Sequence, residues 1–281
     1  MSEETVPAKR NYRPAFNRAS VVLVFCIAVF MPFRWTSQMS AAGPAFRALA
    51  FYSTDVEPDH VKTGNEGLTF FRELAAKDNF VFDTTTDWNK LNDNDLRRYQ
   101  VILWINDFPH TAAQRKGFEN YMNHGGGWLG LHIAGYNDSS TNWPWFVDFL
   151  GGAVFFTNNW PVQRAKLRID DATHPVTKGM PASYEAPSNE WYQWKPSPRL
   201  NPKVRVLVTL DPSNYPIGVK DVITQGDMPI VWTNTKYRMV YMNMGHGENV
   251  FGDETQNKLF ANAILWLGSG KHAAESKGGH K

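Results

Sequence analysis

The chain has 281 residues, of which 42% are hydrophobic and 14% aromatic, and its formal net charge is +2. This length and composition are sufficient for one large domain with an extensive hydrophobic core. The near-neutral charge and the lack of a basic stripe with interleaved aromatic residues argue against nucleic-acid binding.

The first 43 residues differ from the rest of the chain. Basic residues at positions 9–18 precede an apolar run from Ala19 to Phe33, and small residues follow at 40–42. This order is typical of a secretory signal that is cleaved after Ala42. An uncleaved membrane anchor is the alternative, because the run is only slightly shorter than a membrane span. We therefore predict a signal peptide or N-terminal anchor over residues 1–43, with export to the periplasm or cell envelope and, in the anchored form, a membrane tether through residues 19–33.

Cys26, the only cysteine of the chain, lies in this N-terminal segment. A cleaved chain has no thiol, so it can form no disulfide and use no cysteine nucleophile.

Apolar runs alternate with helical periodicity in the first half of the chain. Polar residues 53–63 are predicted to form a loop that contains His60. The predicted strands cover residues 46–52, 80–82, 101–105 and 128–131, and the predicted helices cover 65–76 and 111–123. The second helix opens with a capping box, Thr111-Ala-Ala-Gln114. This alternation predicts right-handed crossovers and an open parallel sheet.

The pattern changes in the second half, where strands follow one another with few helices between them. The predicted elements are a short helix at 143–150, strands at 162–169, 190–194, 204–210, 230–233 and 238–244, and a last helix from about Asp253 to Gly268. Residues 162–169 alternate as an edge or antiparallel strand does. We expect one domain over residues 44–268 and a disordered tail over 269–281.

A glycine-rich segment, residues 123–135, contains the most distinctive pattern of the chain. Three glycines precede a short apolar run, which ends at His132 between Gly130 and Ala134. Small residues on both sides of a central polar side chain are needed where a strand turns sharply into a helix. Such a turn presents the central residue at the carboxyl edge of the sheet. That residue is serine in hydrolases and cysteine in glutamine amidotransferases, and it is histidine here.

Several short motifs follow one another along the chain: Gly125-Gly-Gly-Trp-Leu-Gly-Leu-His132, His174-Pro175, Asn189-Glu-Trp-Tyr192, Pro229-Ile-Val-Trp232 and Gly245-His246. In this order and approximate spacing, the chain resembles the ThuA-like (trehalose utilisation) family over residues 46–268. The resemblance implies an α/β fold of the class I glutamine amidotransferase type. Such a fold has a flavodoxin-like, open, mostly parallel sheet with helices on both faces and, here, antiparallel additions in the second half. The resemblance also implies that the protein acts on disaccharides or oxidised (3-keto) sugars. The family often has aspartate where this chain has Asn189, which disfavours a mechanism that needs two adjacent carboxylates.

Candidate catalytic residues are histidines that follow predicted strands. In open α/β sheets, ligands bind beyond the carboxyl ends of the strands, where His60, His132 and His246 could converge. By resemblance, His246 occupies the place of the amidotransferase catalytic histidine. Glu190 precedes an aromatic pair and could face the same cleft. Imidazole and carboxylate exchange protons near neutral pH, so His132, His246 and Glu190 are the catalytic candidates.

Aromatic side chains supply the candidates for sugar binding, because flat rings stack on the apolar faces of sugars. The substrate-binding candidates are His60, Trp191, Tyr192, Trp143, Trp160 and His174. Each has a structural alternative: the tryptophans can serve ordinary packing, and His174 before Pro175 can be a turn residue. His132 can likewise be a structural hydrogen-bonding group, and Glu190 can pair with an arginine.

No cofactor and no metal ligands are assigned from the sequence. His60, His132, His246 and Glu190 are ligand types that suit zinc or another divalent ion. No close pair such as His-x-x-x-His occurs among them, so their spacing gives no support to the divalent-metal alternative.

The sequence favours an exported enzyme that acts on a small carbohydrate, a disaccharide or 3-keto-sugar, as a lyase, hydrolase or isomerase. His132 and His246 would exchange protons, and Glu190 would orient one of them or act as base. The alternative is a non-catalytic carbohydrate-binding module on an amidotransferase-like shell that has lost its nucleophile. A glutaminase is disfavoured, because a cleaved chain has no thiol.

Overall fold

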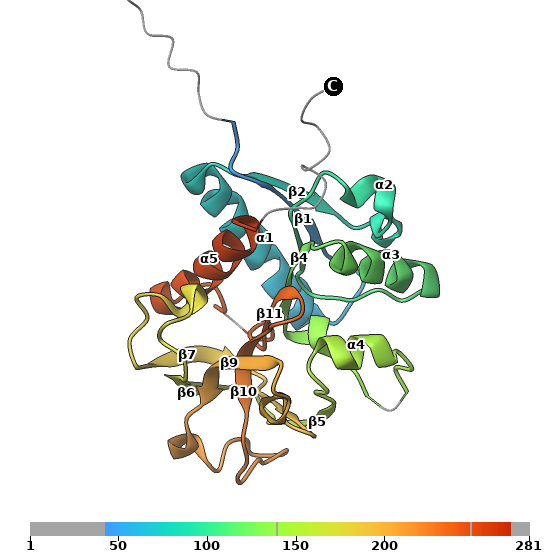
Figure 1. Ribbon diagram of the computed structural model, residues 1–281. Helices are drawn as coiled ribbons and strands as arrows, with labels where there is room; N and C mark the ends of the chain where they lie inside the picture. Colours follow the sequence, from blue (N-terminus) through green and yellow to red (C-terminus); the bar gives the residue numbers. More distant parts are fainter. Residues whose placement is uncertain (1–42, 139, 248, 271–281) are drawn as a thin grey trace, which may run out of the picture. The chain divides into compact units, whose positions relative to one another are not determined.

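The computed structural model describes residues 43–138, 140–247 and 249–270, and these described residues form one compact unit (Figure 1). The signal or anchor predicted for the N-terminus lies outside the described residues, as does the predicted tail from residue 271. Among the described helices, none combines the length and the apolar character that crossing a membrane requires.

A sheet of nine strands organises the described part of the chain, in the order β2-β1-β3-β4-β11-β10-β9-β6-β7. The parallel strands are β1 (Arg47–Phe51), β2 (Val81–Thr85), β3 (Val101–Trp104), β4 (Gly127–Leu131) and β11 (Arg238–Met242). The antiparallel strands that continue the sheet are β10 (Pro229–Asn234), β9 (Val204–Leu210), β6 (Gln163–Ile169) and β7 (Ser183–Asn189). A separate antiparallel pair is formed by β5 (Phe155–Asn158) and β8 (Tyr192–Trp194). The order 2-1-3-4, followed by a fifth parallel strand, is flavodoxin-like and confirms the predicted fold class.

Helices cover both faces of the parallel strands. One apolar core lies under α1 (Pro58–Asp78) and α5 (Glu254–Gly268), with Phe71 and Phe260 completely buried. The other lies under α3 (Ala112–Asn123) and α4 (Pro144–Phe149), with Phe118 and Phe149 completely buried. The remaining short helices are η1 (Trp88–Lys90), α2 (Asp93–Leu96), η2 (His132–Gly135), η3 (Pro175–Thr177), η4 (Pro198–Leu200) and η5 (Pro212–Asn214). Burial on both faces explains why the central strands are continuous apolar runs.

The capping box predicted at the start of α3 is confirmed. The Thr111 hydroxyl accepts a hydrogen bond from the Gln114 backbone N–H at 3.2 Å, and the Gln114 side chain accepts one from the Thr111 N–H at 3.1 Å. Asp253 caps α5 in a similar way, since its carboxylate accepts from the Gln256 N–H at 2.8 Å. These caps satisfy amide groups that have no partner within the helix, and they fix where each helix begins.

Two boundaries near the site differ from the sequence-based prediction. Helix α1 begins at Pro58, so His60 lies in its first turn and not in a loop. Proline suits the first turn, because it lacks the N–H that would be unpaired there. The predicted strand 190–194 is shorter, because β8 begins at Tyr192 and Glu190 lies at the break between β7 and β8.

Candidate functional site

A sharp bend after β4 carries His132. Its φ angle of 45° is left-handed, which is uncommon for a residue with a side chain. The glycines around it are required by close packing: a Cβ on Gly130 would lie 2.0 Å from the Trp128 ring, and one on Gly135 would lie 2.2 Å from the Tyr241 ring. The bend expected from the sequence is therefore present. The turn that follows it is the short helix η2 and not an α-helix.

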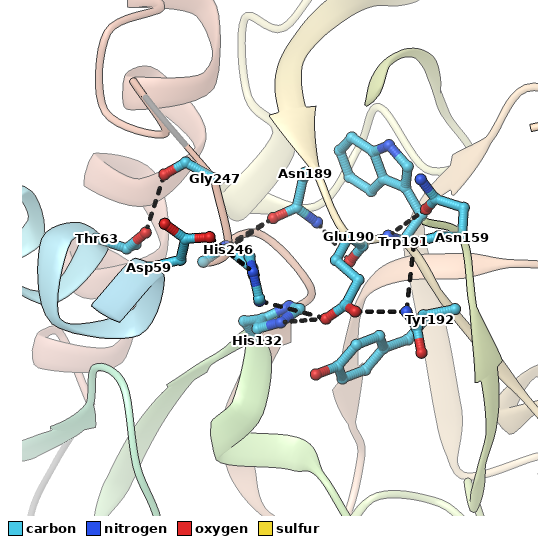
Figure 2. A network of polar contacts seen from close by, with 12 residues as sticks. Asp59, Thr63, His132, Asn159, Asn189, Glu190, Trp191, Tyr192, His246 and Gly247 are labelled. Carbon is cyan, nitrogen blue, oxygen red and sulfur yellow. Dashed lines mark hydrogen bonds and ion pairs between the residues drawn. The ribbon is translucent and has the colours of Figure 1, made fainter. Parts of the chain in front are cut away.

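Three histidines meet at the carboxyl edge of the parallel strands. Two of them, His132 and His246, are shown beside Glu190 in Figure 2. His60 follows β1 on α1, His132 follows β4, and His246 follows β11. One ring nitrogen from each lies within 4.8 Å of the others. The side chains belong to residues that are 6%, 0% and 2% exposed, respectively. The structure thus brings together histidines that lie far apart in the sequence.

The carboxylate of Glu190 joins two of these rings. Its Oε2 lies 3.3 Å from His132 Nε2 and 3.3 Å from His246 Nδ1. The Asn158 side-chain amide donates a hydrogen bond to the other oxygen, Oε1. Asp59 approaches His246 from the far side, with 3.4 Å between Oδ2 and Nε2. The Glu190 side chain is 14% exposed and that of Asp59 47%, so these carboxylates are the parts of the cluster that reach solvent.

Buried asparagines hold the histidines in place. His132 Nδ1 lies 3.0 Å from the backbone oxygen of Asn243. The Asn189 side-chain oxygen accepts hydrogen bonds from the backbone N–H groups of Gly245 and His246, both at 3.0 Å. Its amide nitrogen donates to the Asn243 oxygen at 2.9 Å. Asn158, Asn189 and Asn243 were not predicted as functional residues. An asparagine beside a strand end has no spacing pattern that marks this role.

The surroundings shift the proton affinities of the cluster in different directions. Burial, followed by repulsion from His132 and His246, lowers the pKa of His60 to about 3. Burial also lowers the pKa of His132, although contact with Glu190 opposes this. For His246 burial acts to lower the pKa, but Glu190 and nearby acidic residues outweigh it and raise the pKa. Burial would raise the pKa of Glu190, yet the two imidazoles bring it to about 2. At neutral pH, His60 and His132 are therefore uncharged and Glu190 is ionised.

The predicted aromatic residues divide into two groups. The Tyr192 ring packs on His132 with 4.4 Å between centroids, and Trp160 meets His246 edge-on at 6.1 Å. Trp191 is completely buried, and its indole turns away from the Glu190 carboxylate and donates to the Gln163 backbone oxygen at 2.8 Å (Figure 2). The burial of Trp191 corrects the expectation that it lines an open sugar site.

Trp143 and His174 lie elsewhere, so the structure does not bring these two predicted substrate-binding residues to the histidine cluster. Trp143 stacks on Phe146 at 4.7 Å, inside the core under α3 and α4. His174 caps η3 by accepting a hydrogen bond from the Val176 N–H. Its ring packs on Trp266, whose ring also contacts Arg238 at the start of β11. Since His246 follows the end of β11, His174 lies at the opposite edge of the sheet.

The fold and the bend define a class of protein. An open α/β sheet of this strand order, with a single side chain at a sharp turn after a central parallel strand, is glutamine amidotransferase-like. The chain belongs to the ThuA family (trehalose utilisation), which matches residues 47–267. It is thereby a carbohydrate-related protein.

Solved structures agree with this assignment. A ThuA-like protein from Bacteroides uniformis is 52% identical over 81% of this chain and 93% of its own, with a TM-score of 0.79. A ThuA-like protein from Parabacteroides merdae is 18% identical over 80% of this chain and 90% of its own, with a TM-score of 0.58. A cytoplasmic protein from Salmonella typhimurium LT2, 11% identical over 78% of this chain and 98% of its own, shares the fold with a TM-score of 0.52. No curated protein matches the chain.

Proposed function

We propose that this protein is an exported enzyme that modifies a disaccharide or 3-keto-sugar by acid–base chemistry. The observation that supports it most is the Glu190 carboxylate, which lies at 3.3 Å from two buried imidazoles and is itself partly open to solvent. Carboxylate and imidazole in contact form a proton-exchanging pair. Membership of a trehalose-utilisation family supports a carbohydrate as the substrate.

The burial of each group supports a separate role for it in this proposal. Glu190 is ionised and reaches solvent, so it takes the proton from the substrate. A carbonyl next to the reacting carbon acidifies its C–H bond, which makes a keto-sugar a feasible substrate for a carboxylate base. His246, whose pKa is raised, is the proton donor. His132 has no exposed surface and acts through Glu190, so it is a positioning residue.

A non-catalytic carbohydrate-binding module is the second candidate. The complete burial of His132 and the small exposed fraction of Glu190 favour it, because they leave little reactive surface. In this case the cluster would stabilise the carboxyl edge of the sheet, and the exposed residues around it would hold the sugar without changing it.

Turnover of defined sugars separates the two candidates. The full-length protein is incubated with trehalose, 3-keto-trehalose and 3-keto-glucosides, and products are followed by NMR spectroscopy. We expect turnover of a keto-sugar, and we expect Glu190→Gln to lower kcat by about 100-fold or more, as the loss of a general base does. Glu185→Gln, an exposed change on β7, is the matched control and should keep full activity. Sugar binding without turnover would establish the module, and equal rates for wild type and Glu190→Gln would exclude this site.

A further inference from the structure

Several buried nitrogens of the histidine cluster have no hydrogen-bond partner in the described part of the chain. They are His60 Nε2, His132 Nε2, and both ring nitrogens of His246. The contacts with Glu190 and Asp59 at 3.3–3.4 Å do not have hydrogen-bond geometry, so they do not satisfy these atoms. A buried polar atom without a partner costs about 1–3 kcal/mol, and such atoms are rarely grouped in a folded protein without a reason.

Hydrogen bonds fix which nitrogen of His132 carries its proton. The backbone oxygen of Asn243 can only accept, so Nδ1 at 3.0 Å donates to it. The Asn243 side-chain nitrogen also lies 3.3 Å from Nδ1, but it has the Tyr241 hydroxyl as an acceptor at 3.4 Å. The Asn243 side-chain oxygen accepts from the Tyr192 N–H at 2.9 Å, which sets the orientation of that amide. In uncharged His132, Nε2 therefore bears a lone pair.

This lone pair faces a second group that only accepts. Glu190 Oε2, a carboxylate oxygen, lies 3.3 Å from His132 Nε2 without forming a hydrogen bond to it. Two acceptors at this distance repel unless a cation lies between or beside them. The same oxygen is also 3.3 Å from His246 Nδ1, so one cation in this place would serve all three groups.

We propose that His60, His132, His246 and Glu190 bind one divalent transition-metal ion of the zinc type. This inference rests on the geometry of the cluster and not on the proposed sugar chemistry, and a bound ion would occupy the lone pairs through which Glu190 and His246 exchange protons in that chemistry. Three imidazoles with a carboxylate or an open position are a ligand set that zinc prefers. Histidine ligands of metals almost always donate their second ring nitrogen to a backbone carbonyl or a carboxylate, as His132 does to Asn243.

The cluster needs only a small contraction to hold such an ion. Ligand nitrogens at about 2.0–2.1 Å from a tetrahedral zinc ion are about 3.4 Å apart. The nitrogens here lie within 4.8 Å of one another, so movements of about 1 Å or less per ring, through small side-chain rotations, bring them into range. Asn158 holds Glu190 by Oε1, which leaves Oε2 directed at the histidines. A tetrahedral ion bound by all four groups would have to expand to five ligands to contact a sugar carbonyl or hydroxyl oxygen, which it would then polarise.

A proton is the alternative to a metal ion. Protonated His246 could donate to Glu190 from Nδ1 and to Asp59 from Nε2. A further proton on His132 Nε2 could be shared with Glu190, but neither proton gives His60 Nε2 a partner. A metal ion in reach of all three rings satisfies the three histidines together, and this difference favours it.

Metal binding is measured directly on the full-length protein. The protein is stripped with a chelator and titrated with Zn²⁺ by calorimetry, with Mg²⁺ as comparison, and metal content is measured after purification. We expect one Zn²⁺ per chain and no comparable binding of Mg²⁺. His60→Ala and Glu190→Gln should each weaken Zn²⁺ binding by at least about 10-fold, the loss that follows even when only a supporting residue of a metal site is changed.

Two control variants and a Co²⁺ spectrum test whether a loss of Zn²⁺ binding is specific to the histidine cluster. His174→Ala changes a histidine that is also 6% exposed but lies at the opposite sheet edge, and Glu185→Gln changes an exposed glutamate; both should bind Zn²⁺ as the wild type does. If His60→Ala does not fold, the visible spectrum of Co²⁺ bound to the wild type reports whether histidine ligands hold the ion. Absence of stoichiometric Zn²⁺ or Co²⁺ binding to the folded wild type overturns the inference. Turnover by metal-free protein would show that catalysis does not need the ion, and the proposed function would stand. Zn²⁺ binding without turnover would overturn the proposed function and leave the inferred metal site standing.

Discussion

The backbone at His132 is held in a conformation that costs free energy. A left-handed φ of 45° in a residue other than glycine costs about 1–3 kcal/mol. The Tyr241 hydroxyl donates to the His132 backbone oxygen at 2.8 Å, and the Asn243 oxygen holds the ring. These contacts turn Nε2 toward Glu190, so the strained backbone places the ring where the cluster needs it.

Gly245 is the residue that lets the loop after β11 approach this bend. A Cβ at Gly245 would lie 2.5 Å from the Cβ of His132, a distance that requires one backbone to move. We expect Gly245→Ala to lower the free energy of unfolding by about 1–3 kcal/mol and to separate His246 from His132, with loss of keto-sugar turnover and of Zn²⁺ binding. Urea unfolding and zinc calorimetry measure the two effects.

Gly43→Ala is the control for this change, because nothing lies within 4 Å of a Cβ at Gly43. It should leave stability and zinc affinity as they are. A stable Gly245→Ala protein with unchanged zinc affinity would contradict the role given to the close approach of the two backbones.

At the scale of elements, Asn106 joins the ends of β1 and β3 to the first turn of α1. Its side-chain oxygen accepts from the Ser53 N–H at 2.9 Å, and its amide donates to the backbone oxygens of Ser53 and His60 at 2.9 and 3.1 Å. The residue is 2% exposed. This one side chain therefore fixes the position of His60 relative to the sheet.

Asn106→Ala should loosen α1 where it carries His60. It removes the hydrogen bonds of Asn106 to the partly buried backbone of Ser53 and to the backbone oxygen of buried His60, so we expect a loss of about 1–3 kcal/mol in the free energy of unfolding. Hydrogen exchange should increase in the first turn of α1 more than in α5. Asn94→Ala, on the exposed side of α2, is the control and should change neither. Uniform faster exchange across both helices would show that the side chain serves general stability and does not specifically hold His60.

Sequence patterns predicted elements best where local chemistry sets them. Thr111 and Gln114 start α3 through contacts within one turn, so the sequence alone identifies that boundary. Strand β7 was not predicted, because it contains Pro187 and its pairing with β6 is a tertiary interaction. The residues at the start of α1 are polar, so the sequence predicted a loop there. The buried side of this first turn faces the sheet and the side chain of Asn106, and it therefore carries no continuous apolar stripe.

The site was predictable in part. The strand ends before His132 and His246 indicated the sheet edge where those residues lie, since parallel strands share that edge. The contact between Glu190 Oε2 and both imidazoles could not be predicted, because it depends on the break between β7 and β8. The burial of Trp191 could not be predicted either, since a tryptophan beside a candidate loop has the same sequence pattern whether it is exposed or buried.

At the scale of the whole molecule, the two halves of the sheet are stabilised differently. The parallel half lies between helices on both faces, whereas the antiparallel half carries charged residues that link neighbouring strands. Arg199 bridges Asp170 at 2.8 Å and Asp227 at 3.0 Å, and Arg205 on β9 pairs with Asp171 after β6. Low pH should therefore destabilise the antiparallel half of the sheet more than the parallel half.

The pKa of Asp171 defines the pH range over which this loss of stability occurs. Burial alone would raise its pKa, but the Arg205 guanidinium and the Thr173 hydroxyl and N–H outweigh it and bring the pKa from 3.8 to about 2. Because the folded-state pKa is the lower one, the contribution to stability is complete above about pH 4, falls as the pH drops toward 2, and is absent below it. Because Asp171 is largely hydrated, solvent screening limits its full size to about 1 kcal/mol. Urea unfolding of wild type and Asp171→Asn, followed by tryptophan fluorescence, should give curves that differ by this amount at pH 6 and converge near pH 2. Glu73→Gln, an exposed change on α1, should follow the wild type throughout, and a constant difference between wild type and Asp171→Asn at all pH values would contradict an ionic origin.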